Sequence, residues 1–357
     1  MISSYWGDYD MQITTEPFVD QFARFPASRY MGSKNKIIFE IWQELKKLNF
    51  ESFYDAFAGS NVVSYFLKCQ GKKVITNDFM TFSYLNSKAI IENSSERLSK
   101  EDVKFLLKSN RNNGFSQKTF KNIFFSNEEN IFLDRVRRNI SELENEYKSA
   151  LALSALVRAC LKRRSRGIFT FVGERYNDGR EDLKKSMERH FLENIEIFNS
   201  SVFANGQNNQ AKNSPTEKLR VKADLIYLDP PYFSPKSDND YARRYHFVEG
   251  LVKNWEGLKI QEHTAVKKFK SYVSPFSKKE TVFSAFNHLC DTYKNSIIAI
   301  SYSSNSYPCR DELINMLAKY KSEVKVHEID HTYSFGNQNH KIGNLNNRVK
   351  ENLFIGF

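Results

Sequence analysis

Patterns that mark secreted, zinc-binding and membrane proteins are largely missing from this sequence. Its four cysteines, Cys69, Cys160, Cys290 and Cys309, lie far apart and form no Cys-x-x-Cys pair. We therefore expect reduced thiols in a cytoplasmic protein, and no zinc or other metal site. No uninterrupted apolar run approaches the length of a membrane span. The amino-terminal stretch MISSYWGDYDMQITTE carries acidic residues and no apolar core, so it does not predict a signal peptide.

Basic and aromatic residues, by contrast, are plentiful. The 357-residue chain has 53 Lys and Arg against 42 Asp and Glu, which gives a formal net charge of +11. Such a balance favours polyanionic partners, although charge alone does not identify nucleic acid. With 40% hydrophobic residues, including 30 Phe, the chain can bury a large core. Its length suits one large or two ordinary domains.

Hydrophobic periodicity predicts an α/β fold. Apolar positions at helical spacing indicate a helix over 37–48. Strands are predicted at 53–57 and 73–76, on either side of a helix over 62–69. This order of strand, glycine turn, helix and strand is typical of a nucleotide-binding βαβ unit. Further strands are predicted at 225–228, 297–300, 324–328 and 352–357.

The middle of the chain has a different character. Helical, charged and basic segments dominate from about residue 95 to 205, and the polar stretch 205–217 predicts a mobile loop. The simplest assembly is one open mixed sheet of the Rossmann-like α/β class, built from residues 26–94 and 206–357. A helical domain of residues 95–205 interrupts it, and residues 1–25 form an N-terminal extension.

Two motifs follow the first two predicted strands. The stretch DAFAGSN places Gly59 at a strand end, where a ligand can approach the backbone and the amides of the next helix. Asp78 follows the second strand, where a carboxylate can accept hydrogen bonds from ribose hydroxyls. A strand–helix turn explains the first motif equally well, and a helix cap explains the second. Asn61 stands where such loops usually have a second glycine.

The segment Asp229-Pro230-Pro231-Tyr232 (DPPY) carries the most specific signal. Each proline fixes φ and lacks an N–H, and a residue before proline is held extended. We therefore expect Asp229 to point out of the sheet edge, beside carbonyls without ladder partners and the flat ring of Tyr232. An exocyclic amine on a flipped-out nucleobase requires such acceptors and such a stacking surface. A proline-rich turn is the common alternative, but the position downstream of the glycine loop favours the binding role.

Two basic stretches complete the set. In RYMGSK (29–34), the Tyr30 ring and the Lys34 ammonium could cover an adenine and hold a carboxylate, whereas a helix start capped by Ser33 is the alternative. The second stretch could neutralise phosphates of DNA, although a solvated helix face is the ordinary explanation of a charge run. Its basic residues are Lys162, Arg163, Arg164 and Arg166. Arg175 and Arg180 lie in a nearby stretch that could read groove edges or fill a vacated base position.

Taken in order, these motifs resemble the Dam-type, alpha-class DNA N6-adenine methyltransferases of bacterial restriction–modification systems. Residues 29–34 match that family's RYxGSK or GGK start, 55–60 its DxFxGxG loop, and 229–232 its DPPY motif. The helical insert falls where the family has its DNA-binding target-recognition domain. The resemblance runs from about residue 26 to the end, and the set in this order is specific although no single member is.

The resemblance implies an enzyme that uses S-adenosyl-L-methionine to methylate a flipped-out adenine in double-stranded DNA. A cognate restriction endonuclease is the implied partner. Asp78 would bind the cofactor's ribose, and other residues would line the cofactor along the sheet edge. The implied cofactor-binding residues are Tyr30, Lys34, Asp55, Phe57, Ala58, Gly59, Ser60, Asp78 and Asp229.

The same resemblance implies the catalytic roles. Asp229 and the carbonyl of Pro230 would accept hydrogen bonds from the target amine. Pro231 completes the rigid segment, and the ring of Tyr232 would stack on the flipped adenine. Neither a metal nor a covalent intermediate is needed, because the sulfonium carries the leaving-group chemistry. Catalysis would then rest on positioning and charge placement.

Other functions stay open at this stage. Methylation of cytosine N4 needs the same amine pocket, although Asp at position 229 favours adenine, and RNA is an alternative substrate that the motif order disfavours. A third alternative is a methyltransferase fold that binds DNA but no longer transfers methyl groups. Such a protein would be free to lose one of the motif residues. All are present here: Tyr30, Lys34, Asp78, Asp229 and Tyr232. A Rossmann-like enzyme for a small metabolite accounts for neither the basic insert nor the Pro-Pro-Tyr stretch.

Overall fold

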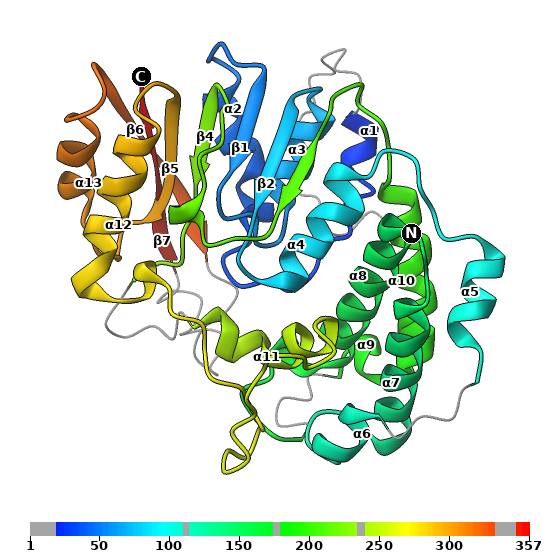
Figure 1. Ribbon diagram of the computed structural model, residues 1–357. Coiled ribbons are helices and arrows are strands. Elements are labelled where there is room, and N and C mark those ends of the chain that lie inside the picture. The colour runs from blue at the N-terminus through cyan, green and yellow to red at the C-terminus, as the bar shows by residue number, and fades with distance from the viewer. Residues whose placement is uncertain (1–18, 110–113, 174–178, 234–239, 333–347) are drawn as a thin grey trace.

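A seven-stranded sheet forms the centre of the computed structural model (Figure 1), which describes residues 19–109, 114–173, 179–233, 240–332 and 348–357. The strand order is β3-β2-β1-β4-β5-β7-β6. Strands β1 to β5 pair in parallel, and β7 runs antiparallel to both β5 and β6. This arrangement confirms the predicted open mixed α/β sheet. The strands are β1 (Ser52–Asp55), β2 (Lys73–Asn77), β3 (Gln210–Lys212), β4 (Leu225–Leu228), β5 (Ile297–Ser303), β6 (Val324–Thr332) and β7 (Arg348–Gly356).

Each face of the sheet carries its own hydrophobic core. Neighbouring residues of one strand point to opposite faces. Phe53 therefore packs in the core that includes α2 and α3, whereas Tyr54 packs in the core that includes α12 and α13. These helices are α2 (Ile38–Leu45), α3 (Val62–Cys69), α12 (Lys279–Thr292) and α13 (Arg310–Leu317).

Most predicted elements are present, and one prediction is wrong. Strand β4 and helix α3 have the predicted bounds. The helix predicted over 37–48 is the shorter α2 (Ile38–Leu45), which the 3-10 turn η1 (Lys34–Lys36) precedes. The stretch 205–217 is not a loop throughout, because its centre forms β3 beside β2. One of its polar side chains bonds to the backbone of the neighbouring strand: Oδ1 of Asn209 accepts a hydrogen bond from the N–H of Val74 at 2.8 Å. An edge strand held in this way needs no apolar pattern.

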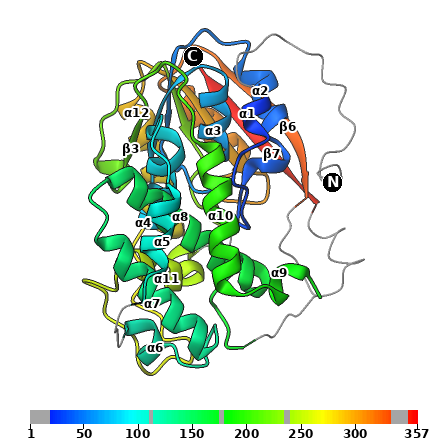
Figure 2. The same ribbon diagram turned by 90° about the vertical axis from the view of Figure 1, so that its right-hand side faces the viewer.

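The helical insert lies beside and below the sheet in Figure 1. Figure 2 shows its two long helices α8 and α10 side by side, and α8 also packs against α4. One hydrophobic core continues from α2 and α3 into α8 and α10. The division into domains at residues 95 and 205 therefore stays a prediction. The helices here are α4 (Thr81–Ser87), the π-helical η2 (Lys88–Glu92), α5 (Lys100–Leu107), α6 (Phe115–Thr119), α7 (Asn127–Ser141), α8 (Glu146–Arg163), the 3-10 turn η3 (Ser165–Gly167), α9 (Glu181–Lys184) and α10 (Met187–Ser201).

Helix α11 (Tyr241–Val252) joins the sheet to the insert. Its Tyr245 ring stacks on Tyr30 with the centroids 5.3 Å apart, and its Phe247 ring meets Phe120 of the insert edge-on at 5.0 Å. After α11 the chain passes through η5 (Pro275–Ser277) into α12. The 3-10 turn η4 (Thr216–Lys218) precedes β4.

The amino-terminal end of the described chain also belongs to the core. Helix α1 (Val19–Phe22) lies within the predicted extension of residues 1–25, and its Phe22 ring meets Phe66 of α3 edge-on at 5.0 Å. Residues 1–18 lie outside the described part. No helix among the described residues is both long and apolar enough to cross a membrane.

Candidate active site

Three carboxylates meet at the carboxyl ends of three neighbouring strands. Asp55 ends β1, Asp78 follows β2, and Asp229 follows β4. The chain leaves β1 for β2 on one side of it, and β4 pairs with β1 on the other side. This is the topological switch point at which open α/β sheets bind their ligands. The structure thus brings together residues that the sequence holds 174 positions apart, from Asp55 to Asp229.

The glycine loop between β1 and α3 is shaped by two residues with positive φ. Gly59 has φ +49°, and a Cβ there would lie 3.0 Å from the ring of Tyr30, so a larger residue would be strained and would press on that ring. Asn61 has φ +66°, a region that Asn tolerates better than most residues. Its side chain donates to the carbonyl of Ser83 at 3.1 Å and accepts from the hydroxyl of Ser87. Asn61 therefore replaces the missing glycine and also ties the loop to α4.

Asp78 holds this loop from the neighbouring strand. Its Oδ2 accepts the N–H of Gly59 at 2.8 Å, and its Oδ1 accepts the N–H of Met80 at 2.8 Å. Burial raises the pKa of Asp78 to about 7. Each carboxylate oxygen keeps a second lone pair, so hydroxyl donors of a ligand could still be bound. The ribose role stays a prediction.

Asp55 supports the loop from inside. Its Oδ2 accepts from the hydroxyl of Ser64 at 2.6 Å, and its Oδ1 accepts the N–H of Phe57 at 3.2 Å. Burial raises the pKa of Asp55 to about 7. Ala58 is tied to β2, because its N–H bonds to the carbonyl of Asn77 at 2.9 Å.

Lys34, which is buried, and Asp229, which is partly exposed, form an ion pair at the centre of the site. The Nζ of Lys34 lies 2.7 Å from Oδ1 and 2.6 Å from Oδ2 of Asp229, and it donates to the carbonyl of Gly32 at 3.1 Å. Burial raises the pKa of Asp229 to about 6, although Lys34 lowers it. Burial disfavours the charged form of Lys34, but Asp229 and Glu351 outweigh that effect and raise its pKa. Lys34 also lies 5.1 Å from the centre of the Tyr232 ring.

Tyr232 points its hydroxyl into this network. The hydroxyl lies 3.0 Å from Oδ1 of Asp229 and is also hydrogen-bonded to Oε1 of Glu351. A phenol has a single proton, so it serves one of the two carboxylates at a time. The ring meets Tyr302 edge-on at 4.9 Å. The sequence motifs gave no sign of Glu351, which comes from β7, far downstream.

The RYMGSK segment is fastened from α11. The hydroxyl of Tyr245 accepts the N–H of Met31 at 2.8 Å, and the hydroxyl of Tyr241 donates to the carbonyl of Met31 at 3.1 Å. The Tyr30 ring lies between Tyr245 and the glycine loop. The hydroxyls of Ser33 and Ser60 are 3.1 Å apart, which joins the two motifs directly. Ser33 makes no side-chain cap, so the predicted alternative role for it is wrong.

A segment that no motif marked closes one side of the site. The Phe276 ring meets Phe57 edge-on at 5.0 Å, and the Tyr272 ring meets Phe79 at 5.8 Å. Residues 272–276 therefore lie against both loops that the motifs define. The sequence carries no sign of them, because this connection between α11 and α12 has no periodic pattern of apolar residues.

The basic run at the end of α8 does not form one phosphate-binding face. Arg164 is buried, and its guanidinium bonds to the carbonyls of Ile168, Phe171 and Gly173. This burial contradicts the predicted DNA contact for Arg164, because the guanidinium holds the following loop instead.

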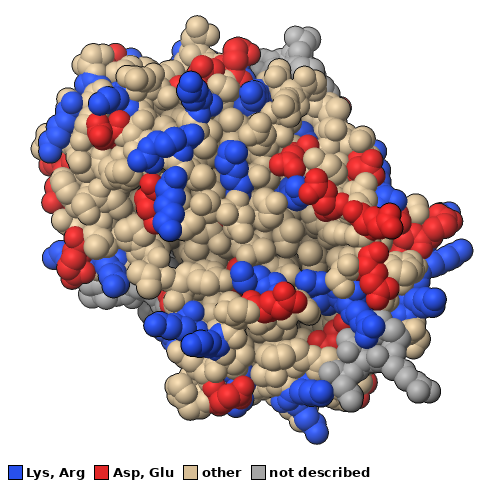
Figure 3. Space-filling view, in the orientation of Figure 1, with Lys and Arg blue, Asp and Glu red and all other residues tan. Residues whose placement is uncertain are grey.

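The other described members of the run are only partly exposed. Arg163 lies 2.7 Å from Glu129, and Lys162 lies 3.5 Å from Asp182. Arg166 and Arg180 are half-buried, and Arg175 lies outside the described residues. In Figure 3 basic and acidic side chains are interspersed across the face shown.

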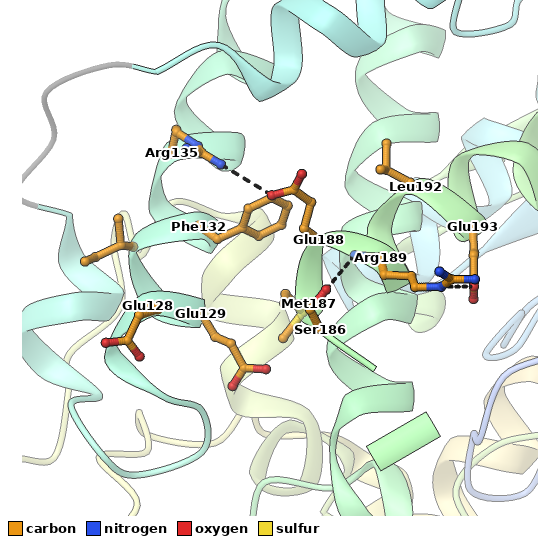
Figure 4. Close-up of a pocket in the computed structure, with 11 residues that line it drawn as sticks. Glu128, Glu129, Phe132, Arg135, Ser186, Met187, Glu188, Arg189, Leu192 and Glu193 are labelled. Carbon is orange, nitrogen blue, oxygen red and sulfur yellow. Dashed lines mark hydrogen bonds and ion pairs between the residues drawn. The ribbon is translucent and has the colours of Figure 1, made fainter. Parts of the chain in front are cut away.

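A separate hollow lies between α7 and α10, on the insert (Figure 4). Arg135 lies 3.9 Å from Glu188, and Arg189 lies 3.0 Å from Glu193. The charged residues that line it are Glu128, Glu129, Glu188, Glu193, Arg135 and Arg189. Because acids outnumber bases, the hollow does not suit phosphates.

The described part of the chain contains no group of three or more His, Cys, Asp or Glu placed to hold a metal ion. All four cysteines are free thiols, and Cys309 is the exposed one.

Comparisons with known proteins show the family of the chain. The model of the family described as D12 class N6 adenine-specific DNA methyltransferase matches residues 30–316. The type II methyltransferase M2.HphI of Haemophilus parahaemolyticus is 30% identical over 334 residues, which is 89% of this chain and 95% of that protein. The modification methylase StsI of Streptococcus sanguinis is 27% identical over 82% of this chain, and M.FokI of Planomicrobium okeanokoites is 27% identical over 85% of it. The chain spans about half of those two proteins, 46% and 48% of their lengths.

Proposed function

Because this chain belongs to the D12 class of N6 adenine-specific DNA methyltransferases, we propose that it transfers the methyl group of S-adenosyl-L-methionine to N6 of a flipped-out adenine at a specific site in duplex DNA. The observation that carries the proposal is Asp229, held by Lys34 and Tyr232 at the end of β4. Relatives named as type II and modification methylases support a role in protecting cytoplasmic, nucleoid-associated DNA from a cognate restriction endonuclease. The family acts on adenine N6, and not on the cytosine N4 that the sequence left open.

The charge of the site fits a cationic cofactor. Asp55, Asp229 and Glu351 bring three buried or largely buried carboxylates around one ammonium, that of Lys34. A sulfonium is positively charged, so this excess of acid favours it over a neutral ligand. When bound, S-adenosyl-L-methionine supplies the activated methyl group. Asp78 would hold its ribose hydroxyls, and Lys34 its carboxylate.

The backbone of Phe57, Ala58, Gly59 and Ser60 would lie along the cofactor, with the Tyr30 ring beside it. Gly59 allows close approach because nothing projects from its Cα, and Tyr30 already lies against that position. The ring pairs of Phe57 with Phe276 and of Phe79 with Tyr272 would exclude water from this side.

Asp229 would orient the target amine. A carboxylate has about four acceptor positions, and at most three here are used by Lys34 and Tyr232. One position remains for an N–H of the adenine amine, and the carbonyl of Pro230 would accept the other. Pro231 keeps the segment rigid, and the Tyr232 ring would stack on the base. Two acceptors on one amine aim its nitrogen lone pair at the methyl carbon, which is catalysis by positioning.

For the DNA interface we retain Lys162, Arg163, Arg166, Arg175 and Arg180 as proposed DNA contacts, within a target-recognition role for residues 95–205. The chain's net charge of +11 supports a polyanionic partner. Arg164 is removed from this set because it is buried.

A direct test uses purified protein, duplex DNA and methyl-labelled S-adenosyl-L-methionine. We expect label in the DNA, and N6-methyladenine when the DNA is digested to nucleosides. Label in N4-methylcytosine, or label in RNA and none in duplex DNA, would contradict the proposal. Calorimetric binding of the cofactor in the same preparation separates a failed reaction from a failed cofactor site.

A further inference from the structure

Glu351 is a buried carboxylate to which no motif and no family comparison gave a role. It lies in β7, opposite Ser303 of β5, and only 1% of its surface is exposed. Strand β7 is the antiparallel strand inserted between β5 and β6. A buried carboxylate is costly unless it is paired, so its partners indicate its purpose.

Those partners are the functional groups of the proposed site. Oε1 of Glu351 accepts a hydrogen bond from the hydroxyl of Tyr232 and another from the hydroxyl of Ser301, the latter at 2.6 Å. The same oxygen lies 3.7 Å from the Nζ of Lys34. Lys34 and Tyr232 both bond Asp229 as well. One oxygen of Glu351 thus reaches both neighbours of Asp229.

We propose that Glu351 is a positioning residue for methyl transfer, which fixes Lys34 and Tyr232 relative to Asp229 from the far side of the network. The proposal rests on the proposed function. Lys34 belongs to the cofactor side of the site and Tyr232 to the base side, so Glu351 connects the two. Without its charge, Lys34 would face Asp229 alone, and the Tyr232 hydroxyl would lose one of its two acceptors.

The charge of Glu351 also acts on the ionisation of Asp229. The groups that face Asp229 are Lys34 from η1, Tyr232, Tyr227 from β4, Asp55 from β1 and Glu351 from β7. Glu351 raises the pKa of Asp229, and Lys34 lowers it. Removing the negative charge of Glu351 therefore lowers the pKa of Asp229. Lys34 would then pair with Asp229 alone, which lowers that pKa further.

The test is Glu351→Gln, which keeps the size of the side chain and removes its charge. We expect kcat at pH 8 to fall about tenfold or more, because the groups around Asp229 lose their common anchor. We also expect the acid limb of the pH–rate profile to move to lower pH, and the cofactor dissociation constant from calorimetry to change through Lys34. A matched control is Glu328→Gln on β6, an exposed carboxylate paired with Lys350, which should alter none of these.

Two further variants keep the test sharp if Glu351→Gln folds poorly. Ser301→Ala removes one hydrogen bond to Glu351 and should lower kcat in the same direction by about threefold. In protein that already carries Tyr232→Phe, adding Glu351→Gln should cost less than it does alone, since the shared bond is gone.

Additive losses in that double variant, together with an unmoved acid limb, would overturn the positioning role. Absence of methyl transfer by the wild-type protein would instead contradict the proposed function, so the two failures are distinguishable.

Discussion

The strand-end site and the basic run at the end of α8 both concentrate charge, but the two regions use it differently. At the strand ends, Lys34, Asp229 and Glu351 converge on one another from three elements. In the run, Arg163 and Arg164 turn to separate partners, an acid on α7 and the carbonyls of the next loop.

The reason is geometric. Parallel strands end at one edge, so residues that follow them must meet, whereas successive residues of a helix point about 100° apart and meet different neighbours. Charge that is adjacent in sequence is therefore a weak guide to a site, and charge placed after successive strands is a strong one.

The largest expected effect belongs to Asp229. Asp229→Asn keeps the shape and removes an acceptor that the target amine needs, so kcat should fall by about 10²–10³-fold or more. Cofactor affinity should fall much less than turnover, because Asp78 remains although Lys34 loses its nearest acid partner. Asp291→Asn, an exposed acid on α12 paired with Lys294, is the control and should leave turnover unchanged. Normal turnover by the Asp229→Asn variant would show that Asp229 is not a catalytic residue.

Arg164, the buried member of the run at the end of α8, should affect stability and not DNA binding. Arg164→Ala leaves three carbonyls without their partner, and should lower the free energy of unfolding by about 3 kcal/mol in urea titrations. Lys162→Ala, two positions away and partly exposed, should change it by less than about 0.5 kcal/mol. Equal effects of the two substitutions would erase the distinction between buried and exposed members of the run.

Replacing Asp78 should weaken cofactor binding more than it lowers the rate of methyl transfer. Asp78→Asn would place an amide opposite the N–H groups of Gly59 and Met80, and should weaken S-adenosyl-L-methionine binding by about 10–100-fold. Turnover at saturating cofactor should fall much less. Calorimetry and steady-state kinetics on one preparation separate these effects, and a loss confined to kcat would refute the ribose role.

The mildest test is pH. Asp229 must be ionised to accept the amine hydrogen bond, and burial raises its pKa to about 6. Protonation of Asp229 at lower pH turns an acceptor into a donor. At saturating cofactor, kcat/KM for DNA should therefore fall as pH drops through about 6 and level off above it. A profile that stays flat to pH 4.5 would show that Asp229 is ionised throughout, and that Lys34 outweighs burial.

Much of this arrangement could be predicted from residue order, because strand ends and glycine turns have local signals. Gly59, Asp78 and the DPPY segment were found in this way, and the structure places them after β1, β2 and β4. Glu351 could not be found, since its role arises only when β7 inserts beside β5. Arg164 was misassigned because burial at the end of α8 depends on a loop that closes over it. Strand β3 was missed because its stretch is polar and lies at an edge.

The measurement that tests the central claim most directly is single-molecule sequencing of host DNA after expression of this chain, with Asp229→Ala expressed in parallel. The account predicts N6-methyladenine in one short sequence motif, absent when Asp229 is replaced. N6-methyladenine in both samples, or modified cytosine in the first, would contradict the assignment of Asp229 as the group that receives the target amine.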